Sequence, residues 1–149
     1  DAIIDGGECN VGVESTIVDF TGEKPVILRP GGVTYDDLKG IGLDVEIDKN
    51  ILHSIAADEV PKCPGMKYKH YAPNAEVTVV EGEKDADKAV MLSAGSTNKE
   101  YAKNLFAALR EFDELGVEVV FAEFSEKDGY GLAVKNRLYK AAAQRVIHV

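Results

Sequence analysis

The sequence lacks tryptophan, has only two cysteines and two methionines in 149 residues, and carries fewer basic side chains than acidic ones, 17 against 26. A net charge of −9 argues against a protein with the large basic face that nucleic-acid binding requires. No apolar run approaches the roughly 18 residues of a membrane-spanning helix, so we predict no membrane segment. The chain opens with Asp1-Ala2-Ile3 rather than with an initiator methionine or a signal peptide, and we expect it to be a fragment or a processed chain.

The two cysteines, Cys9 and Cys63, belong to no CxxC pair and to no cysteine–histidine set with metal-ligand spacing. We interpret them as free thiols in a reducing compartment, which predicts a cytoplasmic protein. A single disulfide between them is the alternative. The sequence also has no HExxH, GxSxG or paired-carboxylate motif, so it offers no candidate catalytic residue and no candidate metal ligand.

The charge is distributed unevenly along the chain. Residues 1–60 carry 13 acids and 4 bases, and residues 76–149 carry 13 acids and 10 bases, whereas residues 61–75 carry three lysines and no acid. An anionic ligand is repelled least at the acid-free stretch of an acidic protein. Segment 61–75 is therefore a candidate for contact with an anion.

Residues 1–48 have the pattern of a β-rich region. The strands predicted by their apolar patterns are 3–5, 11–20, 26–29 and 43–47. The second and third of these are separated by a five-residue turn and should pair as an antiparallel hairpin. Thr34 and Asp37 form a capping-box pattern that opens a short helix to Lys39. These elements bury too little core for an independent domain, so we predict that they are the end of a larger one.

Residues 49–75 have weak periodicity and contain three prolines, and we interpret them as a linker. Unlike a featureless spacer, this linker carries Tyr68, His70 and Tyr71 among its lysines. Aromatic rings interleaved with cations can stack on a base and neutralise phosphates. The same side chains could equally pack against the neighbouring domains, and the residues alone do not decide between the two.

Residues 76–149 have an α/β pattern. Strands are predicted at 77–80, 89–92 and 117–121, and helices at 98–115 and 132–145. Thr97 with Glu100 gives a capping box at the start of the first helix, and Gly116 suits its C-terminal end. Only Glu81–Lys88 separates the first two strands, fewer than the dozen residues that a parallel crossover needs. These strands are therefore antiparallel neighbours, or they are not adjacent, or the recorded sequence lacks a helix between them.

Ser15 and Arg29 lie on the two strands of the predicted hairpin. Arg29 is followed by Pro30-Gly31-Gly32, which ends the strand and allows a ligand to approach the backbone closely. An arginine at a strand end suits a phosphate or a carboxylate. The competing interpretation is a surface arginine paired with one of the many acids and a buried serine in a polar strand, and on chemistry alone this interpretation is the stronger.

Three motifs in this order resemble the two-domain long form of L-threonylcarbamoyladenylate synthase. They are Gly12-Val13-Glu14-Ser15-Thr16-Ile17-Val18-Asp19, Val26-Ile27-Leu28-Arg29-Pro30-Gly31-Gly32 and Pro64-Gly65-Met66-Lys67-Tyr68-Lys69-His70-Tyr71-Ala72-Pro73. The resemblance covers nearly the whole chain. It implies an α/β protein with the C-terminal part of a YrdC-like catalytic domain at 1–48, an interdomain linker at 49–75 and a small Rossmann-like αβ accessory domain at 76–149.

The resemblance implies an enzyme, a nucleotidyltransferase, that forms L-threonylcarbamoyl-adenylate from L-threonine, bicarbonate and ATP and releases pyrophosphate. Partner proteins then transfer the threonylcarbamoyl group to an adenosine of tRNA. By the same resemblance Ser15 holds threonine, Arg29 holds the ATP phosphates, and Tyr71 first and Tyr68 second contact the nucleotide. Mg²⁺ accompanies ATP, and no organic cofactor is implied.

The family's basic Lys-x-Arg motif and its Ser-x-x-Asn-type segment lie upstream of the residues in this sequence. We therefore expect the isolated chain to be inactive. The acidic charge predicts no stable direct binding of tRNA. The alternative, from a different class of protein, is a stand-alone αβ module at 76–149 that senses nucleotides or binds proteins without catalysis.

Overall fold

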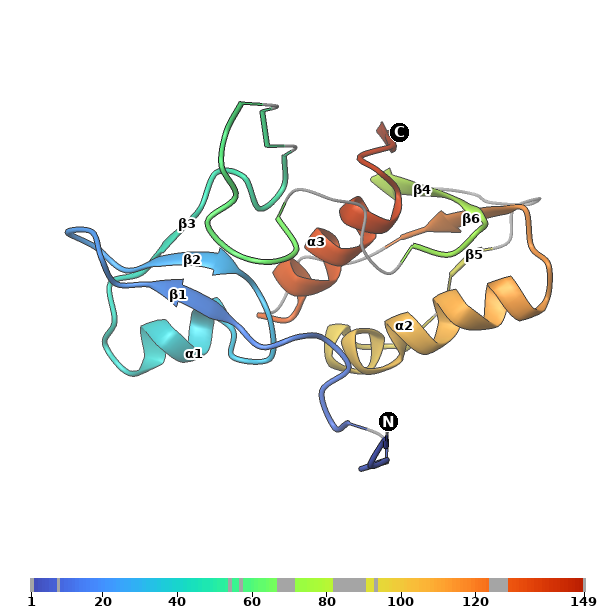
Figure 1. The fold of residues 1–149 in the computed structure, drawn as a ribbon, viewed down its shortest axis with the longest axis horizontal. Helices are drawn as coiled ribbons and strands as arrows, with labels where there is room; N and C mark the ends of the chain where they lie inside the picture. Colours follow the sequence, from blue (N-terminus) through green and yellow to red (C-terminus); the bar gives the residue numbers. More distant parts are fainter. Residues whose placement is uncertain are drawn as a thin grey trace.

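The computed structural model describes residues 2–7, 9–53, 55–56, 58–66, 72–81, 91–92, 94–123 and 129–148 (Figure 1). The helices and strands are, in chain order, β1 (Ile17–Asp19), β2 (Val26–Arg29), α1 (Tyr35–Gly40), β3 (Glu46–Ile47), β4 (Glu76–Glu81), β5 (Met91–Leu92), α2 (Asn98–Glu114), β6 (Val119–Ala122), α3 (Gly131–Ala141) and β7 (Val146–His148). The strands form two separate sheets, so the predicted α/β class is confirmed.

The first sheet has the order β1-β2-β3, with β1 antiparallel to β2 and β2 parallel to β3. The predicted hairpin is confirmed, but its first strand is much shorter than 11–20. The pairing register shifts between Ile17 and Val18, and this irregularity ends the regular ladder. The predicted strand at 3–5 is wrong: residues 2–7 form no strand, and Ile3 and Ile4 are 95% and 96% exposed. The last predicted strand, 43–47, is reduced to the two residues of β3.

Helix α1 begins as the capping-box pattern predicts. The Thr34 hydroxyl accepts a hydrogen bond from the Asp37 backbone N–H at 3.1 Å, and the Asp37 carboxylate accepts one from the Thr34 N–H at 2.8 Å. These reciprocal bonds satisfy donors that have no partner within the helix. They also hold the pKa of the Asp37 carboxyl below its usual value.

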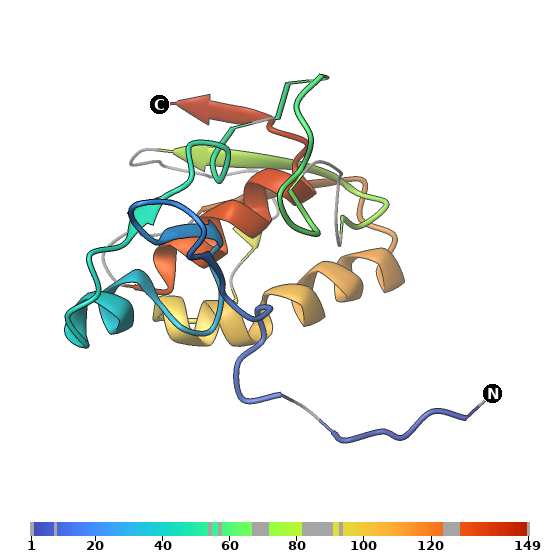
Figure 2. The ribbon, with the colours of Figure 1, turned by 60° about the vertical axis from the view of Figure 1, so that its left-hand side comes forward.

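The second sheet is parallel and has the order β5-β6-β4-β7. Strands β4 and β5 are not adjacent, because β6 lies between them, and this agrees with the second of the three alternatives for the short junction. Both α2 and α3 cover the same face of the sheet (Figure 2). The side chains buried on that face are Val77, Val79, Val120 and Ala122 from the strands and Leu105, Leu109, Val134 and Leu138 from the helices.

The ends of α2 and α3 differ in part from the prediction. Thr97 caps α2 as predicted, since its hydroxyl accepts from the Glu100 N–H, while the Glu100 carboxylate accepts its shortest hydrogen bonds from Ser96, one residue before the predicted partner. The helix predicted to run to residue 145 ends at Ala141. Ala143 and Gln144 have positive φ angles of 49° and 66° and turn the chain into β7, which pairs with β4 and was not predicted.

Helix α3 occupies the centre of the molecule. It lies between the β1-β2-β3 sheet and the parallel sheet (Figure 1). One side of α3 packs on the parallel sheet and α2, as expected for a crossover helix. Its other side therefore faces residues that precede β4 in the chain.

Candidate functional site

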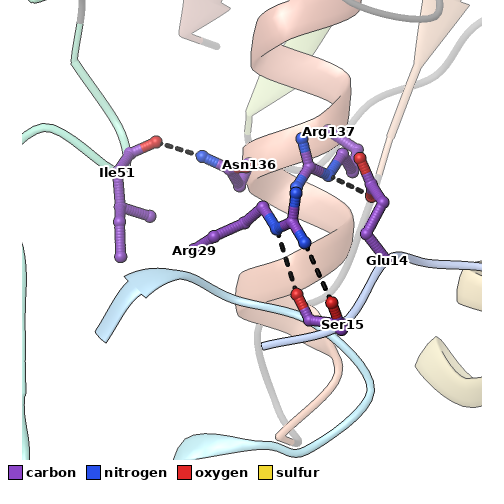
Figure 3. Close-up of polar contacts among 6 residues, drawn as sticks. All are labelled: Glu14, Ser15, Arg29, Ile51, Asn136 and Arg137. Carbon is purple, nitrogen blue, oxygen red and sulfur yellow. Dashed lines mark hydrogen bonds and ion pairs between the residues drawn. The ribbon is translucent and has the colours of Figure 1, made fainter. Parts of the chain in front are cut away.

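The first sheet brings Ser15 and Arg29 together. Ile17 is the partner of Arg29 in the β1–β2 register, and Ser15 lies two residues before Ile17. Side chains two residues apart on an extended chain point to the same face. The Arg29 guanidinium donates from Nε to the Ser15 carbonyl at 3.0 Å and from Nη2 to the Ser15 Oγ at 2.9 Å (Figure 3). A hydroxyl and a guanidinium therefore form one polar unit at the end of β2.

Glycine at position 31 allows the Ser15 segment to lie directly against the turn after β2. A Cβ on Gly31 would lie 2.1 Å from the Glu14 carbonyl oxygen and 2.6 Å from the Ser15 carbonyl carbon. The Gly32 N–H donates to the same Glu14 oxygen at 3.0 Å, and the Val33 N–H donates to Thr16 Oγ1 at 3.0 Å. These backbone and side-chain hydrogen bonds thus fix residues 14–16 against the turn that follows β2.

Arg29 keeps its positive charge available. Within the described part of the chain, no carboxylate lies within ion-pair distance of its guanidinium, so the surface ion pair of the competing interpretation is not observed. Its two partners are neutral oxygen atoms of Ser15. Burial raises the pKa of the nearby Cys63 thiol, and the positive charge of Arg29 acts against this rise. An anion is the ligand that this arrangement favours.

Helix α3 presents three buried polar side chains to the same region. They lie at spacings that share one helix face, and they are Asn136, Arg137 and Lys140, which are 4%, 2% and 5% exposed. Each one contacts a different segment before β4. Arg137 forms an ion pair with Glu14, with 2.7 Å between Nε and Oε2 (Figure 3). Asn136 donates to the Ile51 carbonyl, and Lys140 donates to the Met66 carbonyl.

Sequence reasoning missed these α3 residues. It predicted a helix at 132–145 but gave Arg137 and Lys140 no role. Burial lowers the pKa of the Lys140 ammonium, and the neighbouring Arg137 charge adds to this effect. The available signal was the presence of Asn136, Arg137 and Lys140 on a helix that is otherwise almost wholly apolar, since a long cation in such a helix is rarely buried without a specific partner.

The remaining predicted site residues, Tyr68 and Tyr71, lie outside the described residues. Both cysteines are free, Cys9 exposed and Cys63 buried, so the predicted thiols are confirmed and the alternative disulfide is absent. Where the structure describes the chain, no group of three His, Cys, Asp or Glu side chains could hold a metal ion. The acid nearest the site in sequence, Glu14, is already paired with Arg137. These residues do not form a magnesium site, and we assign no metal ligand among them.

The fold and the site define an α/β protein in which a serine and an arginine form one polar unit at the end of β2. A family model described as the C-terminal domain of threonylcarbamoyl-AMP synthase matches residues 33–143. The threonylcarbamoyl-AMP synthase of Pyrococcus abyssi is 40% identical, over all of this chain and 51% of its own length. That of Bacillus subtilis is 34% identical, over 97% of this chain and 49% of its own length. The chain belongs to the threonylcarbamoyl-AMP synthase family, as the resemblance indicated.

A solved structure gives the same result. The crystal structure of P. abyssi Sua5 complexed with L-threonine is 41% identical and superposes with a TM-score of 0.86, over 100% of this chain and 51% of that one. The chain therefore spans about half the length of the relatives that it matches. The alignment with the P. abyssi synthase extends over 176 positions, 27 more than the 149 residues of this chain, so the relative has additional residues within the matched region. Of the helices that the structure describes, none is long and apolar enough to cross a membrane.

Proposed function

We propose that this chain is part of an enzyme that forms L-threonylcarbamoyl-adenylate from L-threonine, bicarbonate and ATP, with release of pyrophosphate. The observation that supports this most directly is the Ser15–Arg29 pair, a hydroxyl and a guanidinium with no neutralising carboxylate among the described residues. Membership of the synthase family supplies the reaction. The product serves the threonylcarbamoyl modification of tRNA adenosine, through separate transfer proteins and without stable tRNA binding by this chain.

In this proposal Ser15 holds threonine and Arg29 holds the ATP phosphates. A guanidinium has five N–H donors, and Ser15 accepts from two of the Arg29 nitrogens. Donors remain for phosphate oxygens, which match the planar fork of arginine. The pair of bonds to Ser15 orients the guanidinium before ATP binds. Catalysis then depends on positioning and on stabilising charge at the reacting phosphate, and less on proton transfer by a side chain.

The proposal also assigns the domains, the nucleotide contacts, the metal ion and the location of the protein. Residues 1–48 complete a YrdC-like catalytic domain, 49–75 link it to the accessory domain, and 76–149 form that Rossmann-like domain. Tyr71 and then Tyr68 contact the nucleotide. Mg²⁺ arrives with the ATP phosphates, since the described residues offer it no cage. The protein acts in the cytoplasm, in keeping with its two free thiols.

The alternative of an independent module at 76–149 has less support. The buried side chains of Asn136, Arg137 and Lys140 all find their partners in residues that precede β4. A domain that acted alone would leave these polar groups without those partners, at a cost in stability. The contacts therefore favour one functional unit.

The test is to replace Arg29 by alanine in the complete protein. We expect ATP affinity to fall about ten- to a hundredfold, because a charge-assisted contact contributes roughly 1.5–3 kcal/mol. The matched control is Lys24→Ala, which removes the same charge from the turn before β2, where Lys24 pairs with Asp44 and Glu46 in solvent. Calorimetric ATP binding and pyrophosphate release that requires both threonine and bicarbonate are the readouts. Equal effects of the two variants on ATP affinity would contradict the assignment of Arg29, and a wild-type protein without this release would contradict the proposed reaction.

A further inference from the structure

We propose that Arg137 is a positioning residue of the substrate site. From α3 it holds the Glu14 carboxylate, and this contact keeps Ser15 in place and leaves Arg29 free for phosphate. The inference rests on the proposed function. It gives the accessory part of the chain a role in ATP binding that acts through Glu14.

The Arg137–Glu14 ion pair is too deeply buried to be an incidental surface contact. The Arg137 side chain is 1% exposed and that of Glu14 is 20% exposed. Removing a guanidinium from water is costly unless its partner is well placed, and loss of one member leaves the other charge without compensation. Exposed ion pairs, by contrast, contribute little. Arg137 therefore strongly constrains where the Glu14 carboxylate can lie.

Glu14 transmits this constraint to the site because it directly precedes Ser15. On one side the Glu14 carbonyl oxygen accepts from the Gly32 N–H at 3.0 Å. On the other side its carboxylate is held by Arg137. Ser15 in turn accepts both hydrogen bonds from Arg29. Figure 3 shows the two contacts that meet at this segment, Arg137 with Glu14 and Arg29 with Ser15.

The charge of Arg29 also depends on where the Glu14 carboxylate lies. Among the described residues Arg29 has no carboxylate partner, whereas Glu14 stands one residue from the serine that Arg29 binds. If Arg137 were lost, the Glu14 carboxylate would be free to turn toward Arg29. It would then compete with ATP phosphates for the same guanidinium. Arg137 prevents this competition.

The neighbouring residue Asn136 shows how a purely structural contact of α3 would behave. It is 4% exposed and donates to the Ile51 carbonyl, which lies outside the Ser15–Arg29 hairpin. Loss of this bond should loosen the attachment of α3 without releasing a carboxylate beside Arg29. Asn136→Ala is therefore the matched control for Arg137→Met, on the same helix and with comparable burial.

The experiment compares four variants of the complete protein with wild type: Arg137→Met, Glu14→Gln, the double variant and Asn136→Ala. ATP affinity is measured by calorimetry well below each melting temperature. We expect Arg137→Met to weaken ATP binding about tenfold or more, and the double variant to recover to within about threefold of wild type, because glutamine cannot neutralise Arg29. Asn136→Ala should lower the melting temperature and leave ATP affinity unchanged. Arg137→Gln, which also removes the positive charge, replaces Arg137→Met if the latter does not fold.

Three results would overturn the inference. They are wild-type ATP affinity in Arg137→Met, an equal loss of affinity in Asn136→Ala, and a double variant that binds as weakly as Arg137→Met alone. In each of these cases the wild-type protein still forms threonylcarbamoyl-adenylate, so the proposed function stands and only the role of Arg137 falls. A wild-type protein that neither binds ATP nor forms this product would overturn both.

Discussion

Replacing Gly31 by alanine tests whether the Ser15 segment is held as tightly as its contacts indicate. The added Cβ would lie 2.1 Å from the Glu14 carbonyl oxygen, and real Cβ contacts are essentially never under 3.0 Å, so the backbone must move by about 0.9 Å. The neighbouring atoms belong to the main chain, which cannot rotate away as a side chain does. Overpacking of this kind costs about 1–3 kcal/mol. The φ angle of Gly31 lies outside the left-handed region, so the clash alone causes the effect.

A displacement of this size reaches the site. A misplacement of about 1 Å can lower the rate of an enzyme roughly a hundredfold, and Ser15 is the residue displaced. We therefore expect Gly31→Ala in the complete protein to reduce threonine-dependent pyrophosphate release about ten- to a hundredfold. The fall in melting temperature should be about 2–10 °C.

The control for Gly31→Ala is a second glycine with the same clash at a different place. A Cβ on Gly12 would lie 2.1 Å from the Lys103 carbonyl oxygen in α2, away from Ser15 and Arg29. Gly12→Ala should therefore lower the melting temperature by a similar amount and retain most of the activity per folded molecule. Activity that falls equally in both variants would refute the reasoning, and so would a Gly31→Ala protein with unchanged stability and unchanged activity.

Three further predictions follow from individual side chains. Burial lowers the pKa of Lys140, so between this lowered pKa and the ordinary value of 10.5 the folded state binds fewer protons than the unfolded state, and stability should rise with pH. The rise of melting temperature with pH, measured from about pH 7 to about pH 10, should be smaller in Lys140→Met. Burial raises the pKa of the Cys63 thiol, so a thiol reagent should modify Cys9 rapidly and Cys63 only on unfolding, and rapid modification of both would contradict the structure. Thr34→Ala should lower the free energy of unfolding by about 0.5–2 kcal/mol in urea titrations, whereas Thr34→Ser keeps the cap and most of the stability.

The sequence predicts best the elements that depend on neighbouring residues. The hairpin of β1 and β2 and the capping box at Thr34 are set by local patterns, and both are present. The end of α3 was misplaced because its chain reversal uses Ala143 and Gln144 at positive φ, a conformation that glycine usually signals. The strand at 3–5 was wrong because apolar residues alone do not supply a pairing partner.

The candidate site was predictable only in part. Ser15 and Arg29 could be brought together because a hairpin register links them. The role of α3 could not, because Arg137 and Glu14 lie at opposite ends of the sequence and no local pattern joins them. Tyr68 and Tyr71 lie outside the described residues, and their contact with the nucleotide stays a prediction.

The long separation in sequence between Glu14 and α3 also determines when the site can be completed during synthesis. Arg137 follows Glu14 by 123 residues, so the contact between them cannot form until the ribosome has passed that point. At about 5–20 residues per second this interval is roughly 6–25 s. During this interval the nascent Ser15 segment can form its hydrogen bonds to the turn after β2 but not its ion pair with Arg137 on α3. A translation product that stopped before α3 would carry Ser15 and Arg29 without the Arg137–Glu14 ion pair that orders them. The contact therefore ties an ordered site to the synthesis of α3.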